Sequence, residues 1–177
     1  MREPYVSELN NASNQRLLLW LVPVFNTIHN AEEALLMPRL LEARNAAIPS
    51  RLHVLLPPIT DRQLLISLAI VTAIPYIIAL VCDLKRKRGP GVYLLLGFQS
   101  VMLVNVLAHV MMSILISGYA PGVATAVVLN LPFSIYLLRT TVNERWVSRR
   151  ALALLGVAAV IIHTVGLPGL IILASGL

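Results

Sequence analysis

The sequence predicts an all-α, polytopic transmembrane helical bundle of about five spans, with an interfacial segment after the first. The chain is 58% hydrophobic and only 12% charged, whereas soluble domains carry about 25% charged residues. The mean hydropathy of +0.80 agrees with a membrane protein. Several apolar runs approach the roughly 20 residues that a helix needs to cross a bilayer. The lipid bilayer is therefore the first partner that the sequence indicates.

The 177 residues form a single membrane domain, because a chain of this length is usually one folding unit. We predict spans at approximately residues 17–38, 63–83, 92–116, 122–138 and 151–175. The fourth run is short, and it can cross if the bilayer thins or if neighbouring helices cover its ends. Two linkers that contain glycine and proline, residues 85–91 and 117–122, predict tight turns between antiparallel neighbours.

The stretch from 42 to 62 is different, because Pro49, Pro57 and Pro58 interrupt its short apolar run. It is too broken to span, and we expect an interfacial or re-entrant segment that covers the outer mouth of the bundle. The first 16 residues are polar, and no small-residue cleavage site follows the first apolar run. The first span is therefore expected to be a retained helix and not a signal peptide.

The basic residues predict the orientation of the chain. With the turn at 85–91 on the cytoplasmic side, ten Lys and Arg residues lie on that side and four on the other, which together make the 14 of the chain. This asymmetry predicts a cytoplasmic N-terminus. The sequence pI near 10.1 could suggest nucleic-acid binding. We exclude a nucleic-acid partner, because the basic residues gather in short loops between apolar segments.

Three ionisable residues lie within the first apolar run: His29, Glu32 and Glu33. A charge at the centre of a bilayer costs on the order of 2.5–3.5 kcal/mol, so two adjacent carboxylates require a partner. In a helix, residues three and four apart share a face, which places His29 beside both glutamates, one turn before them. This polar stripe predicts a functional site inside the membrane.

The later spans supply further polar residues at a similar depth. Asn105 and His109 are four residues apart on the third span, Asn130 lies on the fourth and His163 on the fifth. At a rise of about 1.5 Å per residue, all of them lie close to one layer of a hydrocarbon core about 30 Å thick. We therefore predict a single site to which four spans contribute.

A metal centre is the sharpest interpretation of this layer. His29, Glu33 and His109 would be ligands of a divalent ion, zinc or iron, and His163 would be a fourth ligand. The spacing of His29 and Glu33 resembles the logic of the H-x-x-E-H helix of zinc hydrolases, with the last histidine replaced by a carboxylate. A divalent cation would also remove the mutual repulsion of the two neighbouring carboxylates.

The remaining polar residues fit supporting roles around such an ion. Glu32 is the predicted catalytic residue, acting as a general base that activates a water molecule. Asn105 and Asn130 are predicted to orient the metal ligands from behind. Hydrogen bonding between helices is an alternative role for Asn130 and His163.

These residues predict a membrane-embedded, metal-dependent enzyme that acts on a lipid-like or other apolar substrate. Hydrolysis is expected with a redox-inert ion, and oxidative chemistry with iron. Three alternatives stay open. The first is a metal-free acid–base isomerase in which the two glutamates titrate together. The second is a proton-coupled transporter or ion-binding protein, which at this size would need to be a homo-oligomer. The third is a structural or partner-binding membrane protein.

The segment His29-Asn30-Ala31-Glu32-Glu33 resembles the motif of the HXXEE domain family, which comprises small multi-pass, mostly bacterial membrane proteins. Two further segments, 105–109 and 119–126, resemble the second polar motif and the Pro-Gly turn of that family. The resemblance implies a helical membrane bundle with a shared polar site, in a bacterial inner membrane. It implies no reaction, because the function of that family is uncharacterised.

A second similarity is to the CAAX-protease-like intramembrane hydrolases, which use a Glu-Glu pair on one helix and histidines on two later helices. Glu32, Glu33, His109 and His163 follow the same order. The pair is followed by Ala-Leu-Leu-Met and not by an arginine, and Asn105 replaces an aromatic residue of that family. We interpret this similarity as convergent chemistry and not as kinship.

Overall fold

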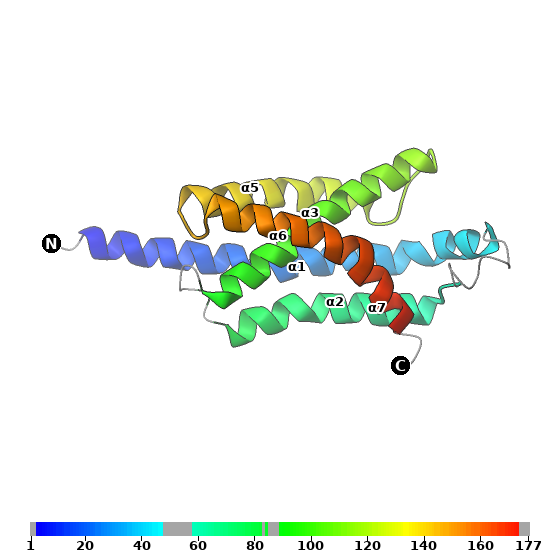
Figure 1. Ribbon diagram of the computed structural model, residues 1–177, viewed down its shortest axis with the longest axis horizontal. Helices are drawn as coiled ribbons and strands as arrows, with labels where there is room; N and C mark the ends of the chain where they lie inside the picture. The colour runs from blue at the N-terminus through cyan, green and yellow to red at the C-terminus, as the bar shows by residue number, and fades with distance from the viewer. Residues whose placement is uncertain (1–2, 48–57, 83, 85–88, 174–177) are drawn as a thin grey trace.

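A bundle of long helices makes up the chain (Figure 1). The computed structural model describes residues 3–47, 58–82, 84 and 89–173, and all regular secondary structure in these ranges is helical. Two of the long helices contain one π-helical turn each. The turn η2 lies between α4 and α5, and the turn η3 lies between α6 and α7. The elements are α1 (Glu3–Ala47), α2 (Asp61–Val81), α3 (Pro90–Leu115), α4 (Val123–Thr125), η2 (Ala126–Asn130), α5 (Leu131–Asn143), α6 (Arg149–Ile161), η3 (Ile162–Gly166) and α7 (Leu167–Leu173).

Within the described residues, four helical stretches are long and apolar enough to cross a membrane, which confirms the predicted membrane helical bundle. They are Asp61–Val81, Pro90–Leu115, Val123–Asn143 and Arg149–Leu173. The third of these has 21 residues, because its helix continues to Asn143 beyond the predicted end at residue 138. The last two residues of the predicted fifth span, 174 and 175, lie outside the described residues.

The first predicted span lies within α1, a helix of 45 residues that runs the length of the bundle beside α2 (Figure 1). α1 does not have the hydropathy of the other four, because its apolar section carries two asparagines, a histidine and two glutamates. Residues 42–47 of the predicted interfacial segment continue α1 as helix. Residues 48–57 of that segment lie outside the described residues, so the interfacial prediction stays a prediction.

Local sequence signals explain where three of the helices begin. Thr60 and Gln63 form a reciprocal capping box at the start of α2. Pro90 follows the N-cap Gly89 of α3, at a position where a proline costs no helical hydrogen bond. Ser148 caps α6 by accepting a hydrogen bond from the backbone N–H of Ala151.

The apolar core occupies the half of the bundle nearer the α5–α6 turn. Fully buried side chains from α1, α3, α5 and that turn meet there: Leu19, Val22, Leu95, Leu96, Leu137 and Trp146. Phe25 and Phe133 pack edge to face, with ring centroids 4.8 Å apart. The rod from α6 to α7 instead exposes many large apolar side chains, as expected of a helix that faces lipid.

Candidate metal centre

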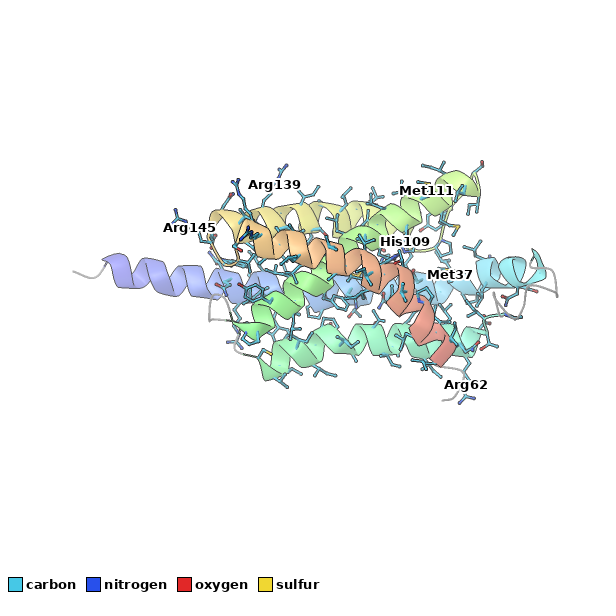
Figure 2. The ribbon with its side chains drawn as sticks, in the orientation of Figure 1. Met37, Arg62, His109, Met111, Arg139 and Arg145 are labelled. Atoms are coloured by element: carbon cyan, nitrogen blue, oxygen red, sulfur yellow. The ribbon has the colours of Figure 1, made fainter. Side chains whose placement is uncertain are left out.

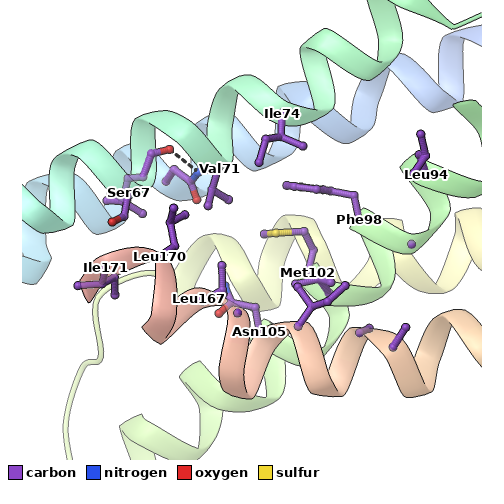
Figure 3. Close-up of a pocket in the computed structure, with 18 of the residues that line it drawn as sticks. Ser67, Val71, Ile74, Leu94, Phe98, Met102, Asn105, Leu167, Leu170 and Ile171 are labelled. Carbon is purple, nitrogen blue, oxygen red and sulfur yellow. Dashed lines mark hydrogen bonds between the residues drawn. The ribbon is translucent and has the colours of Figure 1, made fainter. Parts of the chain in front are cut away.

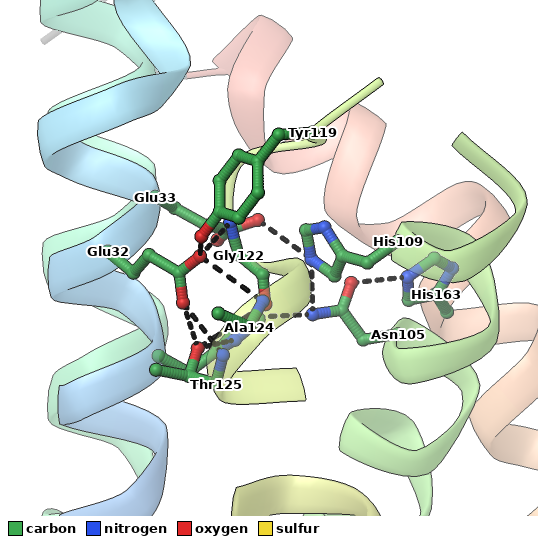
Figure 4. Close-up of polar contacts among 10 residues, drawn as sticks. Glu32, Glu33, Asn105, His109, Tyr119, Gly122, Ala124, Thr125 and His163 are labelled. Atoms are coloured by element: carbon green, nitrogen blue, oxygen red, sulfur yellow. Dashed lines mark hydrogen bonds and ion pairs between the residues drawn. The ribbon is translucent and has the colours of Figure 1, made fainter. Parts of the chain in front are cut away.

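A network of polar side chains joins α1, α3 and η3 inside the bundle (Figure 4). Nε2 of His109 lies 3.0 Å from Oε1 of Glu33. The amide nitrogen Nδ2 of Asn105 lies 2.7 Å from Nε2 of His29 and 3.1 Å from Nε2 of His109. Most of the side chains that the sequence placed in one layer therefore meet in one cluster, although His29 and Asn105 are 76 residues apart in the chain.

Three of these residues form a group that could hold a metal ion. One potential ligand atom each of His29, Glu33 and His109 lies within 4.8 Å of the other two, and the two histidines are buried while the Glu33 side chain is 12% exposed. A tetrahedral zinc ion with bonds of 2.0–2.1 Å needs donor atoms about 3.3 Å apart. The group would therefore close on an ion through side-chain movements of about 1 Å, with the Asn105 amide turned out of the space between the imidazoles.

Hydrogen-bond donors fix which nitrogen of His29 carries a proton. The hydroxyl of Thr125 has one hydrogen, and its neighbours on that side are acceptors, Oε2 of Glu32 at 2.6 Å and the carbonyl of Gly122 at 3.3 Å. Towards Nδ1 of His29, which is 2.9 Å away, this hydroxyl must therefore accept. A neutral His29 then carries its proton on Nδ1 and directs the lone pair of Nε2 into the cluster, which is the tautomer that a metal ligand needs.

Nε2 of His109 lies between two polar groups, the Glu33 carboxylate on one side and the NH₂ group of Asn105 on the other. A proton on this nitrogen would be donated to Glu33, and the Asn105 amide would then donate to Nε2 of His29 alone. A divalent cation within the group would take the place of that proton as the positive partner of the carboxylate.

Glu32 points away from this cluster and into the turn before α4 (Figure 4). Its carboxylate accepts hydrogen bonds from the backbone N–H groups of Gly122, Ala124 and Thr125 at 3.0, 3.4 and 2.8 Å. It also accepts hydrogen bonds from the hydroxyls of Thr125 and Tyr119. The hydrogen bond to the Glu32 carboxylate, followed by burial, raises the pKa of Tyr119 above its ordinary value of 10.0. Glu32 thus ties α1 to the turn.

Gly122 brings this turn close to the cluster. Its φ of 86° lies in the left-handed region, where residues with a side chain are strained. A Cβ at this position would lie 2.7 Å from Cε1 of His109 and 3.0 Å from Cγ of Glu33. Only glycine therefore allows the backbone to contact both predicted ligands.

Sequence reasoning did not assign site roles to Tyr119, Gly122 and Thr125. The available signal was the Pro-Gly turn at the depth of the polar layer. Such a turn exposes backbone N–H groups at the start of a helix, and these groups favour a carboxylate. The turn supplies two of the five hydrogen bonds to Glu32, from Tyr119 and Gly122, and the first turn of the following helix supplies the other three, from Ala124 and Thr125.

The structure places His163 and Asn130 outside the group of three. Nε2 of His163 lies 2.9 Å from Oδ1 of Asn105, so the histidine donates to the amide that separates the two imidazoles. His163 lies on η3, and such π-helical turns are frequent at functional sites. Asn130 is 1% exposed, and its amide finds no hydrogen-bond partner among the described residues. Asn130 is therefore buried but is not connected to the cluster.

A cavity of about 650 Å³ lies beside the cluster, between α2, α3 and the rod from α6 to α7 (Figure 3). Its walls are almost entirely apolar and include Val71, Phe98 and Met102. The polar residues in its lining are Asn30, Glu33, Ser67, Tyr93 and Asn105. Glu33 and Asn105 belong to the cluster, so the cavity reaches the candidate metal centre.

Comparisons with known proteins give a family and no activity. The chain is 24% identical over 107 residues to the uncharacterized protein YrkK of Bacillus subtilis (strain 168), and the match covers 60% of this chain and 63% of that protein. The chain thus spans less than two thirds of this relative. No solved structure matches the chain. Residues 20–137 match the family described as proteins of unknown function with an HXXEE motif, and the chain therefore belongs to this family.

Proposed function

We propose that this chain is a membrane-embedded, metal-dependent enzyme whose ion is held by His29, Glu33 and His109. The observation that carries the proposal is that His29, Glu33 and His109 each bring one potential metal-binding atom within 4.8 Å of the other two. A carboxylate inside a membrane bundle is costly without a positive partner, which a divalent cation would supply. The orientation of His29 by Thr125 supports the same interpretation, because metal-bound histidines usually donate their other N–H to a neighbouring acceptor.

The cavity supports a lipid-like substrate. Its volume of about 650 Å³ falls within the range of sites that hold one small molecule. Along α3 it extends from Tyr93 to Asn105, which corresponds to about 18 Å at the rise of a helix. This length is close to the roughly 15 Å of one leaflet of the hydrocarbon core. A single hydrocarbon chain would lie along the apolar walls and place its polar end beside Glu33 and Asn105.

The reaction that we propose is hydrolysis. A divalent ion at this position would polarise a carbonyl or phosphoryl oxygen and lower the pKa of a bound water. Glu32 then acts as a positioning residue, because its five hydrogen-bond donors occupy both of its oxygens. With iron in place of zinc, the same donor set would support oxidative chemistry. We also propose that the enzyme lies in a bacterial inner membrane, because its relative is bacterial. The uneven distribution of Lys and Arg supports a cytoplasmic N-terminus.

Elemental analysis of the full chain, purified in mild detergent without chelators, tests the metal centre. We expect about one zinc or iron per chain, lost in Glu33→Ala and in His109→Ala. Glu42→Ala is the matched control, because it removes an exposed carboxylate from the same helix. His163→Ala should keep the ion, since this residue lies behind Asn105. Wild-type protein without a stoichiometric metal would overturn the proposal.

A metal-free acid–base enzyme is the second candidate, and one contact favours it. Glu33 and His109 lie 3.0 Å apart and can share a proton in the absence of an ion. The two candidates differ in their response to chelators. Hydrolysis of a probe such as p-nitrophenyl palmitate should stop when a chelator removes a catalytic ion and return when zinc is restored. Isomerisation of a double bond without metal would select the acid–base enzyme.

A further inference from the structure

A second cavity, of about 540 Å³, lies at the other end of the bundle from the polar cluster, between α5 and α6. Arg139 on α5 and Arg149 at the start of α6 line it, together with Asn143. Figure 2 shows Arg139 beside the turn that joins the two helices. Both arginines are exposed, and neither forms an ion pair within the described part of the chain. Two guanidinium groups from different helices therefore face one cavity without a counter-charge.

The floor of this cavity is apolar. Ile135, Leu138 and Val142 are spaced by three and four residues, so they lie on one face of α5, and Leu152 faces them from α6. From Asn143 to Ile135 this face extends about 12 Å along the helix, away from the charged mouth and towards the centre of the bundle. The cavity thus combines a cationic entrance at the end of two spans with a hydrocarbon wall along them.

We propose that this cavity binds an anionic phospholipid, with the phosphate between Arg139 and Arg149 and one acyl chain along α5. Arginine recognises phosphate through paired N–H groups, and the N-terminus of α6 adds the positive end of its helix dipole. A free phosphate ion would use only the mouth and leave the apolar floor unused. A phospholipid matches both parts, and basic pockets between transmembrane helices are known to take lipid headgroups.

Native mass spectrometry of the full chain released from detergent tests this site. The probes are phosphatidylglycerol and phosphatidylcholine with identical acyl chains. We expect the protein to retain phosphatidylglycerol at least about tenfold better, and the variant Arg139→Gln/Arg149→Gln to lose this preference. The control Arg16→Gln/Arg39→Gln removes the same charge from exposed positions of α1 and should keep the preference. Arg139→Lys/Arg149→Lys should restore part of it.

Three results would overturn the lipid site. They are equal retention of the two lipids by the wild type, an unchanged preference in the glutamine variant, and displacement of phosphatidylglycerol by inorganic phosphate at equal concentration. The last result would assign the arginines to a free anion. Thermal unfolding and metal content should be the same in all these variants, because neither arginine contacts the His29 cluster. The proposal therefore stands or falls independently of the metal centre.

Discussion

The hydroxyl of Thr125 lies 2.9 Å from Nδ1 of His29 and so fixes the orientation of a ring that is 96 residues away in the sequence. The same hydroxyl is 2.6 Å from Glu32, one turn further along α1. The side chain of Thr125 in α4 thus contacts both His29 and Glu32 of the motif. This contact keeps the proton of a neutral His29 on Nδ1 and leaves the lone pair of Nε2 directed into the cluster.

Thr125→Val should weaken metal binding without abolishing it. Valine keeps the shape of the residue but cannot accept from Nδ1 of His29, and losing such a support typically lowers metal affinity about 10- to 100-fold. Zinc titration with a competing chelator measures the change. Thr141→Val is the control, because its buried hydroxyl donates only to the carbonyl of Leu138 in its own helix. Equal affinities in wild type and Thr125→Val would refute the role of Thr125.

Gly122→Ala should disrupt both the turn and the ligand group. The new Cβ would lie 2.7 Å from Cε1 of His109, and the backbone φ of 86° would become strained. Destabilisation by more than about 1 kcal/mol is expected for alanine at a positive φ. Gly156→Ala is the control, since a Cβ there meets nothing within 4 Å. Thermal unfolding and metal content measure the two effects, and an unchanged metal content would contradict the close approach of the turn.

Glu32→Gln separates an anchoring role from a general-base role. An amide NH₂ group in place of a carboxylate oxygen would face N–H donors of the turn, so an anchoring Glu32 predicts a lower unfolding temperature and weaker metal binding. A general base predicts full metal content and stability with loss of turnover. Unfolding temperature, metal affinity and hydrolysis of the ester probe distinguish the two roles. Glu42→Gln serves as the control, because Glu42 is exposed on the same helix.

The Tyr119–Glu32 hydrogen bond should stabilise the protein only while the phenol is protonated. Because the bond raises the pKa of Tyr119, its contribution is complete below the ordinary value of 10.0 and is lost as the pH rises through the folded-state pKa. The gap in unfolding temperature between wild type and Tyr119→Phe should therefore vanish at high pH. Tyr136→Phe, which changes an exposed tyrosine of α5, should show no such trend. A gap that widens with pH would contradict the assignment.

Val71→Trp should block the large cavity and leave the metal centre in place. Val71 points into the cavity from α2 (Figure 3), so an indole there would take the space of a hydrocarbon chain. We expect about a tenfold loss in binding of a fluorescent fatty acid, with unchanged metal content. Ile77→Trp is the matched control, because Ile77 is exposed and does not line the cavity. Equal binding by both variants would exclude this cavity as the lipid site.

Composition and charge spacing were sufficient to predict the helical membrane bundle, because burial in lipid imposes a length and an apolarity on each span. The motif spacing was also sufficient to bring His29, Glu33 and His109 together, since each lies at a similar depth on a predicted helix. These inferences need only the rise of a helix and the cost of a membrane charge.

The partners of Glu32 were not predictable in the same way. Depth along a span says nothing about the direction of a side chain, and the direction of Glu32 depends on where the turn at Gly122 packs. Asn130 shows the same limit, because it lies at the expected depth but on a π-helical turn that does not connect it to the cluster. A π-helical turn changes the register of a helix, and the sequence pattern carried no signal for it.

Glu32 and Glu33, the two adjacent glutamates of the motif, point in different directions and so have different roles. Successive residues of an α-helix are separated by about 100° around its axis, so two neighbouring glutamates point towards different parts of the molecule. One carboxylate closes a backbone turn, and the other presents its charge to a histidine of α3. The two glutamates are therefore not redundant. Neither can replace the other as long as α1 keeps its orientation in the bundle.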